Sequence, residues 1–208
     1  MIVDKRAWIW LGLLILGVIG YMAFQFIKMG GSGDHGPKQA PMKINQHSET
    51  FNNSVSATLK AYDEMHNAFV EDDSVKAKEA CRKMLALTDS IKIEELKKDT
   101  AGIFFTDSSA LVDLRANANS LLAQKEITEM RKDFNMVSDN LFNFVRAIHY
   151  KGPTLYWQYC PMAFGEDKGA NWISNTEEIF NPYLGKHHPE FKSGMLHCGE
   201  VKDSIVSQ

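Results

Sequence analysis

An uncharged apolar run near the N-terminus restricts what this chain can fold into more than any other feature does. It spans residues 7–27, with no charged side chain from Ala7 to Ile27. As a helix with a rise of about 1.5 Å per residue, it would be about 31 Å long, close to the hydrocarbon thickness of a bilayer. Trp8 and Trp10 lie near one end, where aromatic rings prefer the membrane interface. The run predicts a single N-terminal transmembrane helix.

A cleaved signal peptide is the alternative interpretation of this run. Such a peptide has an apolar core of about 7–15 residues and a cleavage site of small residues, whereas this run is longer and bulky up to Lys28. Lys5 and Arg6 favour a cytoplasmic N-terminus, and Lys28 and Lys38 weaken that bias. We expect a single-pass anchor over residues 1–28 in a bacterial membrane, with the soluble part periplasmic or otherwise extracytoplasmic.

Composition describes the rest as an ordinary globular protein. The chain is 44% hydrophobic and has a formal net charge of −3, which gives no electrostatic footprint for nucleic acid. Three cysteines are too few for a disulfide-dense scaffold, although one bridge is possible outside the cytoplasm. Residues 29–50 are rich in glycine and proline and predict a flexible linker.

Residues 51–151 carry apolar positions at spacings of three and four, the period of an amphipathic helix. Three stripes start near Phe51, Ala77 and Leu111. Ser74 or Asp73, and Asp107 or Ser108, are the N-terminal caps we expect for the second and third helices. The fourth stripe is the most regular: Ile127, Met130, Phe134, Val137, Leu141, Phe144 and Ile148. Short connections favour antiparallel neighbours, so the fold class is mainly α, with an up-down four-helix bundle.

The helical spacing of apolar residues ends at Gly152. We expect residues 152–208 to form a small α+β or irregular C-terminal module. Residues 155–159 are aromatic and strand-like, and residues 171–174 predict a second short strand. A segment of about 55 residues is too small for a comfortable core of its own. It must pack on the bundle, or be stabilised by a metal or a disulfide.

Two of the three cysteines lie in this module, each near a methionine. Cys160 and Met162 are two residues apart and would share one face of a strand, while Met195 and Cys198 are three apart, within the span of a tight turn. Thiolates and thioethers are soft ligands that suit Cu(I), with Ag(I) as a chemical mimic. His197 is the fifth candidate ligand. The sequence therefore predicts a Cu(I) site.

The neighbouring histidines leave a second ion choice open. If His197 or the pair His187 and His188 takes the place of the methionines, zinc or Cu(II) becomes an equal alternative, because imidazole suits those ions. A disulfide between Cys160 and Cys198 is the main non-metal alternative. It would contribute about 3–4 kcal/mol in the chain-entropy model, and the methionines would then serve only packing.

Four segments of the module carry a family resemblance. Residues 156–164 (Tyr-Trp-Gln-Tyr-Cys-Pro-Met-Ala-Phe), 169–174, 181–185 (Asn-Pro-Tyr-Leu-Gly) and 195–199 (Met-Leu-His-Cys-Gly) resemble one exported domain of unknown function. That domain occurs in Bacteroidetes-type bacteria, alone or at the C-terminus of heavy-metal efflux adaptor subunits. The resemblance covers about residues 52–202 and is most specific in the last fifty.

The resemblance implies a helical region followed by a compact module with the Cys-Pro-Met and Met-x-x-Cys groups, and it supports a copper or heavy-metal role. The segment of residues 185–194 is longer than the corresponding segment of the family. We expect a membrane-anchored heavy-metal-binding protein for sequestration, resistance or delivery to a heavy-metal efflux system. The alternative is a structural or interaction module with a Cys160–Cys198 disulfide. Without a phosphate-binding glycine loop or a Cys-x-x-Cys pair, we expect no enzyme.

Overall fold

The structure, a computed structural model, describes residues 16–18, 20–22, 24–25, 47–98 and 103–206. The chain divides into two units, residues 1–43 and residues 44–208. The first contains described helical residues only at 16–18, 20–22 and 24–25, and the second contains every other helix and strand that the structure describes.

The prediction of a single N-terminal transmembrane helix is wrong. No helix among the described residues has the length and the apolar character needed to cross a membrane. Of the run 7–27, the structure describes residues 16–18, 20–22 and 24–25. The other residues of the run, and the expected linker as far as residue 46, lie outside the described residues.

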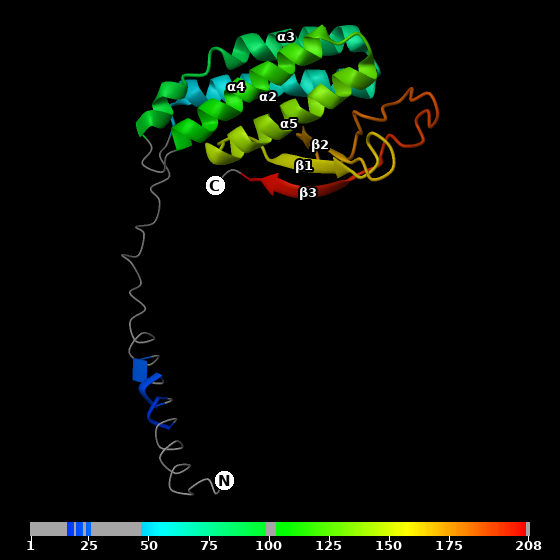
Figure 1. Ribbon diagram of the computed structural model, residues 1–208. Coiled ribbons are helices and arrows are strands. Elements are labelled where there is room, and N and C mark those ends of the chain that lie inside the picture. Colours follow the sequence, from blue (N-terminus) through cyan, green and yellow to red (C-terminus); the bar gives the residue numbers. More distant parts are fainter. Residues whose placement is uncertain (1–15, 19, 23, 26–46, 99–102, 207–208) are drawn as a thin grey trace, which may run out of the picture. The chain divides into compact units, whose positions relative to one another are not determined.

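Four α-helices and one 3-10 helix make up the larger part of the second unit. They are α2 (Glu49–Val70), α3 (Ser74–Thr88), η1 (Ile93–Lys98), α4 (Ile103–Ala123) and α5 (Ile127–Ala147). The α-helices lie side by side as a bundle, in which α2 packs on α3, α3 on α4, and α4 on α5 (Figure 1).

Helix starts follow local capping chemistry. The Ser48 side chain accepts a hydrogen bond from the Phe51 N–H and caps α2, so the expected linker ends before residue 50. Asp73 caps α3 by accepting from the Lys76 N–H, as the sequence indicated. The expected cap at Asp107 is wrong, because α4 already begins at Ile103 and Asp107 is buried within the helix.

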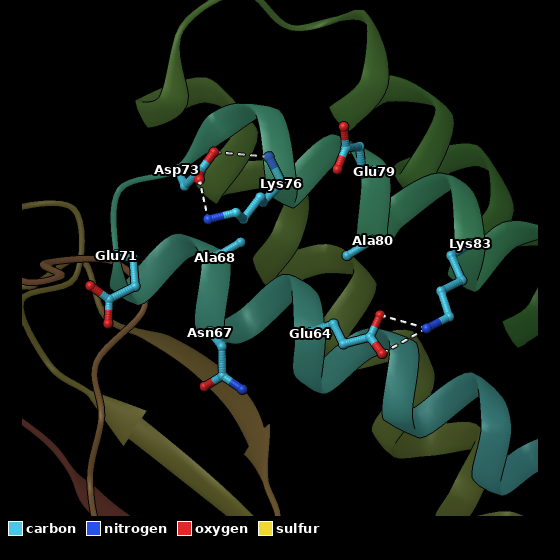
Figure 2. Close-up of a pocket in the computed structure, with 9 residues that line it drawn as sticks. All are labelled: Glu64, Asn67, Ala68, Glu71, Asp73, Lys76, Glu79, Ala80 and Lys83. Carbon is cyan, nitrogen blue, oxygen red and sulfur yellow. Dashed lines mark hydrogen bonds and ion pairs between the residues drawn. The ribbon is translucent and has the colours of Figure 1, made fainter.

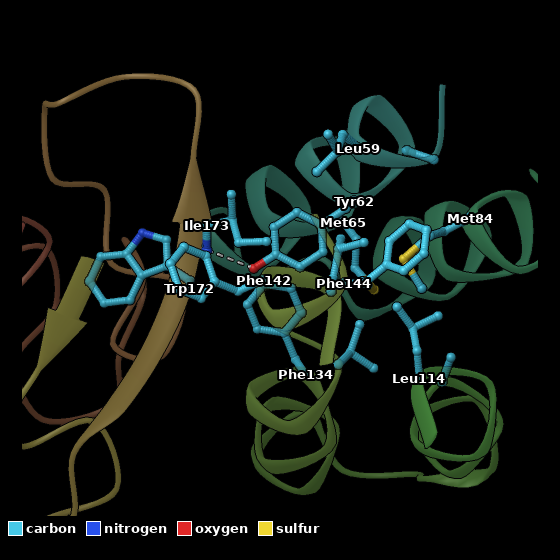
Figure 3. Packing of buried hydrophobic residues seen from close by; sticks show 14 of the residues in the cluster. Leu59, Tyr62, Met65, Met84, Leu114, Phe134, Phe142, Phe144, Trp172 and Ile173 are labelled. Atoms are coloured by element: carbon cyan, nitrogen blue, oxygen red, sulfur yellow. Dashed lines mark hydrogen bonds between the residues drawn. The ribbon is translucent and has the colours of Figure 1, made fainter. Parts of the chain in front are cut away.

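The core of the bundle is aromatic and continues into the C-terminal module (Figure 3). Phe134 on α5 lies with its ring centroid 5.2 Å from Tyr62 and 4.9 Å from Phe69, both on α2. The same ring lies 6.0 Å from Tyr183 of the module. Burying aromatic side chains of this size is a major contribution to stability, and here one cluster serves both regions.

A three-stranded antiparallel sheet packs against α5, in the order β2-β1-β3. Its strands are β1 (Leu155–Cys160), β2 (Ala170–Ser174) and β3 (Glu200–Ile205). Trp157 of β1 stacks on Phe142 of α5 at 4.2 Å. The Ile173 N–H of β2 donates to the Tyr62 hydroxyl, as Figure 3 shows. The sheet therefore completes the core of the bundle on that side.

A buried arginine attaches the module to the end of the bundle. Arg131 of α5 pairs with Asp72 at 2.5 Å and donates to the backbone carbonyls of Phe69 and Pro182. Asp72 also accepts from the His187 N–H at 2.9 Å. Gly185 has a φ of +58° at this point, and a Cβ there would lie 2.9 Å from the guanidinium. The segment after Pro182 thus follows a path that only glycine accommodates well.

Candidate metal centre

The centre of the candidate site is a pair of thiols, one at the end of β1 and one just before β3. Cys160 is the last residue of β1 and is completely buried, at 0% exposure. Cys198 lies two residues before β3 and is half-buried. Their sulfur atoms are 3.4 Å apart, and both cysteines are free thiols. Residues 38 positions apart in the sequence are therefore within direct contact.

Asn181 holds the backbone of Cys198 in place. Its carboxamide, at 0% exposure, donates a hydrogen bond of 2.8 Å to the Cys198 carbonyl. Its side-chain oxygen accepts from the Tyr183 and Leu184 N–H groups, and its own N–H donates to the Leu196 carbonyl at 2.8 Å. Every polar atom of Asn181 is thus hydrogen-bonded. These bonds fix the segment that carries Cys198.

Gly199 provides a second constraint on the same thiol. Its φ is +147°, and a Cβ there would lie 2.8 Å from the Tyr159 carbonyl and 3.0 Å from the Trp172 ring. A side chain at this position would push the segment away from β1. The glycine therefore permits the close approach of the two strands' ends that brings Cys198 to Cys160.

The spacing of the sulfur atoms suits two chemical outcomes. Two thiolates at about 2.3 Å from one ion lie about 3.8 Å apart at a tetrahedral angle and further apart at the wider angle of a low coordination number, so a metal opens the pair from the observed distance. A disulfide needs the sulfur atoms to close to about 2.0 Å. Both outcomes start from two thiols that are already in contact.

Burial keeps the half-buried thiol protonated. Burial, together with the neighbouring Cys160 thiol, raises the pKa of the Cys198 thiol to about 11. Cys198 is therefore protonated at neutral pH, unlike the thiolates of reactive cysteines. A metal bound here must displace protons, so its binding strengthens as the pH rises. The third cysteine, Cys81, is buried in the bundle, where burial raises its pKa to about 12.

The predicted methionine ligands occupy different environments. Met195 is half-buried and packs against the core, and its carbonyl accepts from the Cys198 N–H at 3.0 Å, which closes a turn between the two residues. Met162 is 36% exposed and lines a cavity of about 630 Å³ between the end of α2, the start of α5 and the module. The turn keeps the backbone of Met195 close to that of Cys198.

The rings of His197 and His188 each form hydrogen bonds with backbone groups. The His197 ring donates from Nδ1 to the Ile179 carbonyl at 2.7 Å. His188 accepts from the Glu190 and Phe191 N–H groups through Nδ1, and it lines the 630 Å³ cavity together with His187. Within the described part of the chain, no three or more His, Cys, Asp or Glu side chains gather as a metal-binding group. Among the described residues, the two thiols are therefore not joined by a third such ligand.

A second hollow lies on the bundle, in a groove of about 550 Å³ between α2 and α3 (Figure 2). Its charged side chains are partly neutralised in pairs, because Lys83 binds Glu64 at 2.6 Å and Lys76 binds Asp73 at 3.1 Å. Figure 2 shows these pairs on opposite sides of the small residues Ala68 and Ala80. The groove offers no organised set of ligands.

Asn181 and Gly199 are the site residues that the sequence did not single out. Both lie in segments with a recognisable signal, the turn-rich Asn-Pro-Tyr at residues 181–183 and the glycine directly after Cys198. Neither residue type is a metal ligand, so a search for ligands passes over them. Their role is to hold the backbone, which only the fold makes visible.

Comparison with known families places part of the chain. Residues 58–151 match the family DUF3347, described as a protein of unknown function. That segment is similar to this family. The match lies in the bundle and ends before β1, so the motifs around Cys160 and Cys198 and the link to efflux adaptors are not confirmed by it. No curated protein and no solved structure matches the chain.

Proposed function

We propose that Cys160 and Cys198 hold one soft metal ion, in the first place Cu(I). The observation that carries this proposal is the pair of free thiols 3.4 Å apart, one buried and one half-buried. Asn181 and Gly199 fix the backbone around Cys198, so little ordering remains to be done on binding.

The donor set decides which ion is favoured. Thiolates bind Cu(I) well in low coordination numbers, and Ag(I) shares this preference. A structural zinc site takes four Cys or His ligands, and no third such residue joins the pair among the described residues. Zinc is therefore disfavoured here. Met195, tied to Cys198 by the turn, is the thioether that would serve as a third ligand.

The biological role that fits such a site is sequestration of a toxic soft metal, resistance to it, or delivery to an efflux system. The resemblance of residues 156–199 to a domain associated with heavy-metal efflux adaptors supports this role. We also propose an extracytoplasmic location for the site. The raised pKa of the Cys198 thiol argues against a nucleophilic enzyme, so we propose binding and not catalysis.

Native mass spectrometry of the reduced full chain titrated with Cu(I) tests the proposal. We expect one tightly bound equivalent in the native sequence and none in the double variant Cys160→Ser, Cys198→Ser. Cys81→Ala is the matched control, because it removes a buried thiol far from the pair. Failure of the native chain to bind Cu(I) would overturn the metal function, and binding by the double variant would overturn the choice of ligands.

The second candidate is a structural or interaction module closed by a Cys160–Cys198 disulfide. The same short distance between the sulfur atoms favours it in an oxidising compartment. The two candidates differ in the purified state of the thiols. Mass mapping after alkylation without a reductant distinguishes them, since a structural disulfide predicts a chain that protects both cysteines and binds no copper until reduced.

A further inference from the structure

The two thiols are unequally accessible, and this asymmetry bears on how an ion reaches them. Cys160 is sealed at the end of β1, with 0% exposure, and its strand position pairs with Ala170 of β2. Cys198 is half-buried and has exposed neighbours on both sides, His197 and Glu200 among them. An incoming group can therefore contact the Cys198 sulfur before it contacts the Cys160 sulfur.

A bare Cu(I) ion is not the species that such a site meets, because soft ions in contact with thiols travel as thiolate complexes. A carrier of this kind has bulk that the position of Cys160 excludes. We propose that Cys198 is the entry thiol, which exchanges first with a thiol-bearing Cu(I) carrier, and that Cys160 completes the site in a second exchange. This inference rests on the proposed function and names the partner class that supplies the ion.

The exchange balances without any change of oxidation state. In the first step, the Cys198 sulfur forms a bond to the copper of a bis-thiolate complex, one carrier thiolate leaves, and the Cys198 proton goes to it. In the second step, the Cys160 sulfur replaces the remaining carrier thiolate, which leaves with the Cys160 proton. Copper stays Cu(I) throughout, and two carrier thiols are released. Reversal of the same steps hands the ion on to another thiol.

The two single-cysteine variants separate the steps. The full chain with Cys160→Ser, mixed with the Cu(I)–glutathione complex, should retain one copper and one glutathione on Cys198 in native mass spectrometry. The full chain with Cys198→Ser should retain neither, because Cys160 is inaccessible to the complex. The unchanged chain should carry one copper and no glutathione, and Cys81→Ala should match it.

The possible results are distinct. A glutathione–copper adduct on Cys198→Ser but not on Cys160→Ser would overturn the proposed order, and so would equal adducts on both. Absence of copper from the unchanged chain would instead overturn the proposed function. Alkylation of the reduced, unchanged chain gives a measurement that needs no variant to fold. We expect Cys198 to react at least tenfold faster than Cys160, and equal rates would contradict an entry thiol.

Discussion

The bundle and the C-terminal module both bury their interiors, but different interactions fix their conformations. In the bundle, helices α2 to α5 present apolar stripes to one another, and Phe134 packs among Tyr62 and Phe69. In the module, individual polar groups determine the path of the chain, among them Asn181 and the Arg131–Asp72 pair. Apolar packing tolerates change of similar volume, whereas a buried polar anchor has few substitutes.

This difference has a consequence for the candidate site. The thiol pair lies in the region where the chain path depends on a few directed hydrogen bonds, so loss of one bond can change the spacing of the sulfur atoms without unfolding the bundle. Sites held by oriented second-layer contacts depend on them in this way.

The largest effect is expected where the two regions share one side chain. Phe134→Ala removes the ring that contacts Tyr62, Phe69 and Tyr183, and we expect a loss of about 3–5 kcal/mol in the free energy of unfolding. Denaturant unfolding monitored by circular dichroism measures it. Phe105→Ala is the control, because that ring is 78% exposed and its loss should cost within about 0.5 kcal/mol. Similar losses in both variants would contradict the assignment of the shared core.

The second effect should separate the regions. Asp72→Asn leaves the buried Arg131 guanidinium without its carboxylate, and we expect a loss of about 3 kcal/mol. Hydrogen exchange should increase first at the His187 amide, whose acceptor is the same carboxylate, while amides in the middle of α5 stay protected. Glu64→Gln, which breaks the exposed pair with Lys83, should cost about 0.5 kcal/mol or less. Uniform exchange through both regions would show that they do not differ in this respect.

The bundle could be predicted from the sequence more completely than the C-terminal module. The stripe from Ile127 to Ile148 coincides with α5, because burial on a helix repeats every three or four residues and is visible in the sequence. β3 has no such signal, since its residues are mostly exposed and its pairing with β1 joins distant segments. The expected membrane span was wrong, because no helix among the described residues is long and apolar enough to cross a bilayer.

Only part of the candidate site could be predicted from the sequence. Cys160 and Cys198 stand out by residue type and by their neighbouring methionines, which is information that a sequence holds. Their contact at 3.4 Å depends on β1, Asn181 and Gly199 together, so no local pattern contains it. The attachment of His197 to the Ile179 carbonyl is equally a product of the fold.

The third effect is a pH dependence located in the bundle. Burial raises the pKa of Asp139 on α5 from 3.8 to about 6. The folded state therefore holds this proton more tightly than the unfolded state, and stability falls as the pH rises from about 4 to 6, by up to about 3 kcal/mol. Above that range both states are ionised and the loss is complete. Asp139→Asn should be as stable as the unchanged chain at pH 4 and more stable at pH 7.

Denaturant unfolding of both chains at several pH values measures this difference. Asp133→Asn is the matched control, because it makes the same substitution on the same helix. A constant gap between Asp139→Asn and the unchanged chain from pH 4 to 7 would mean that this carboxyl group is not perturbed. Because Asp139 lies in the bundle, the copper stoichiometry of the module should be the same in both chains.

The smallest change in stability should have a specific effect on the thiols. Asn181→Asp keeps an oxygen to accept from the Tyr183 and Leu184 N–H groups but, when ionised, cannot donate to the Cys198 carbonyl. We expect a cost of about 2 kcal/mol and at least a tenfold loss of Cu(I) affinity, measured by competition with a chromophoric Cu(I) chelator. Asn52→Asp, at the N-terminal end of α2, is the control for the same chemical change outside the module. A drop in stability with unchanged Cu(I) affinity would mean that Asn181 supports the loop but does not set the spacing of the two sulfur atoms.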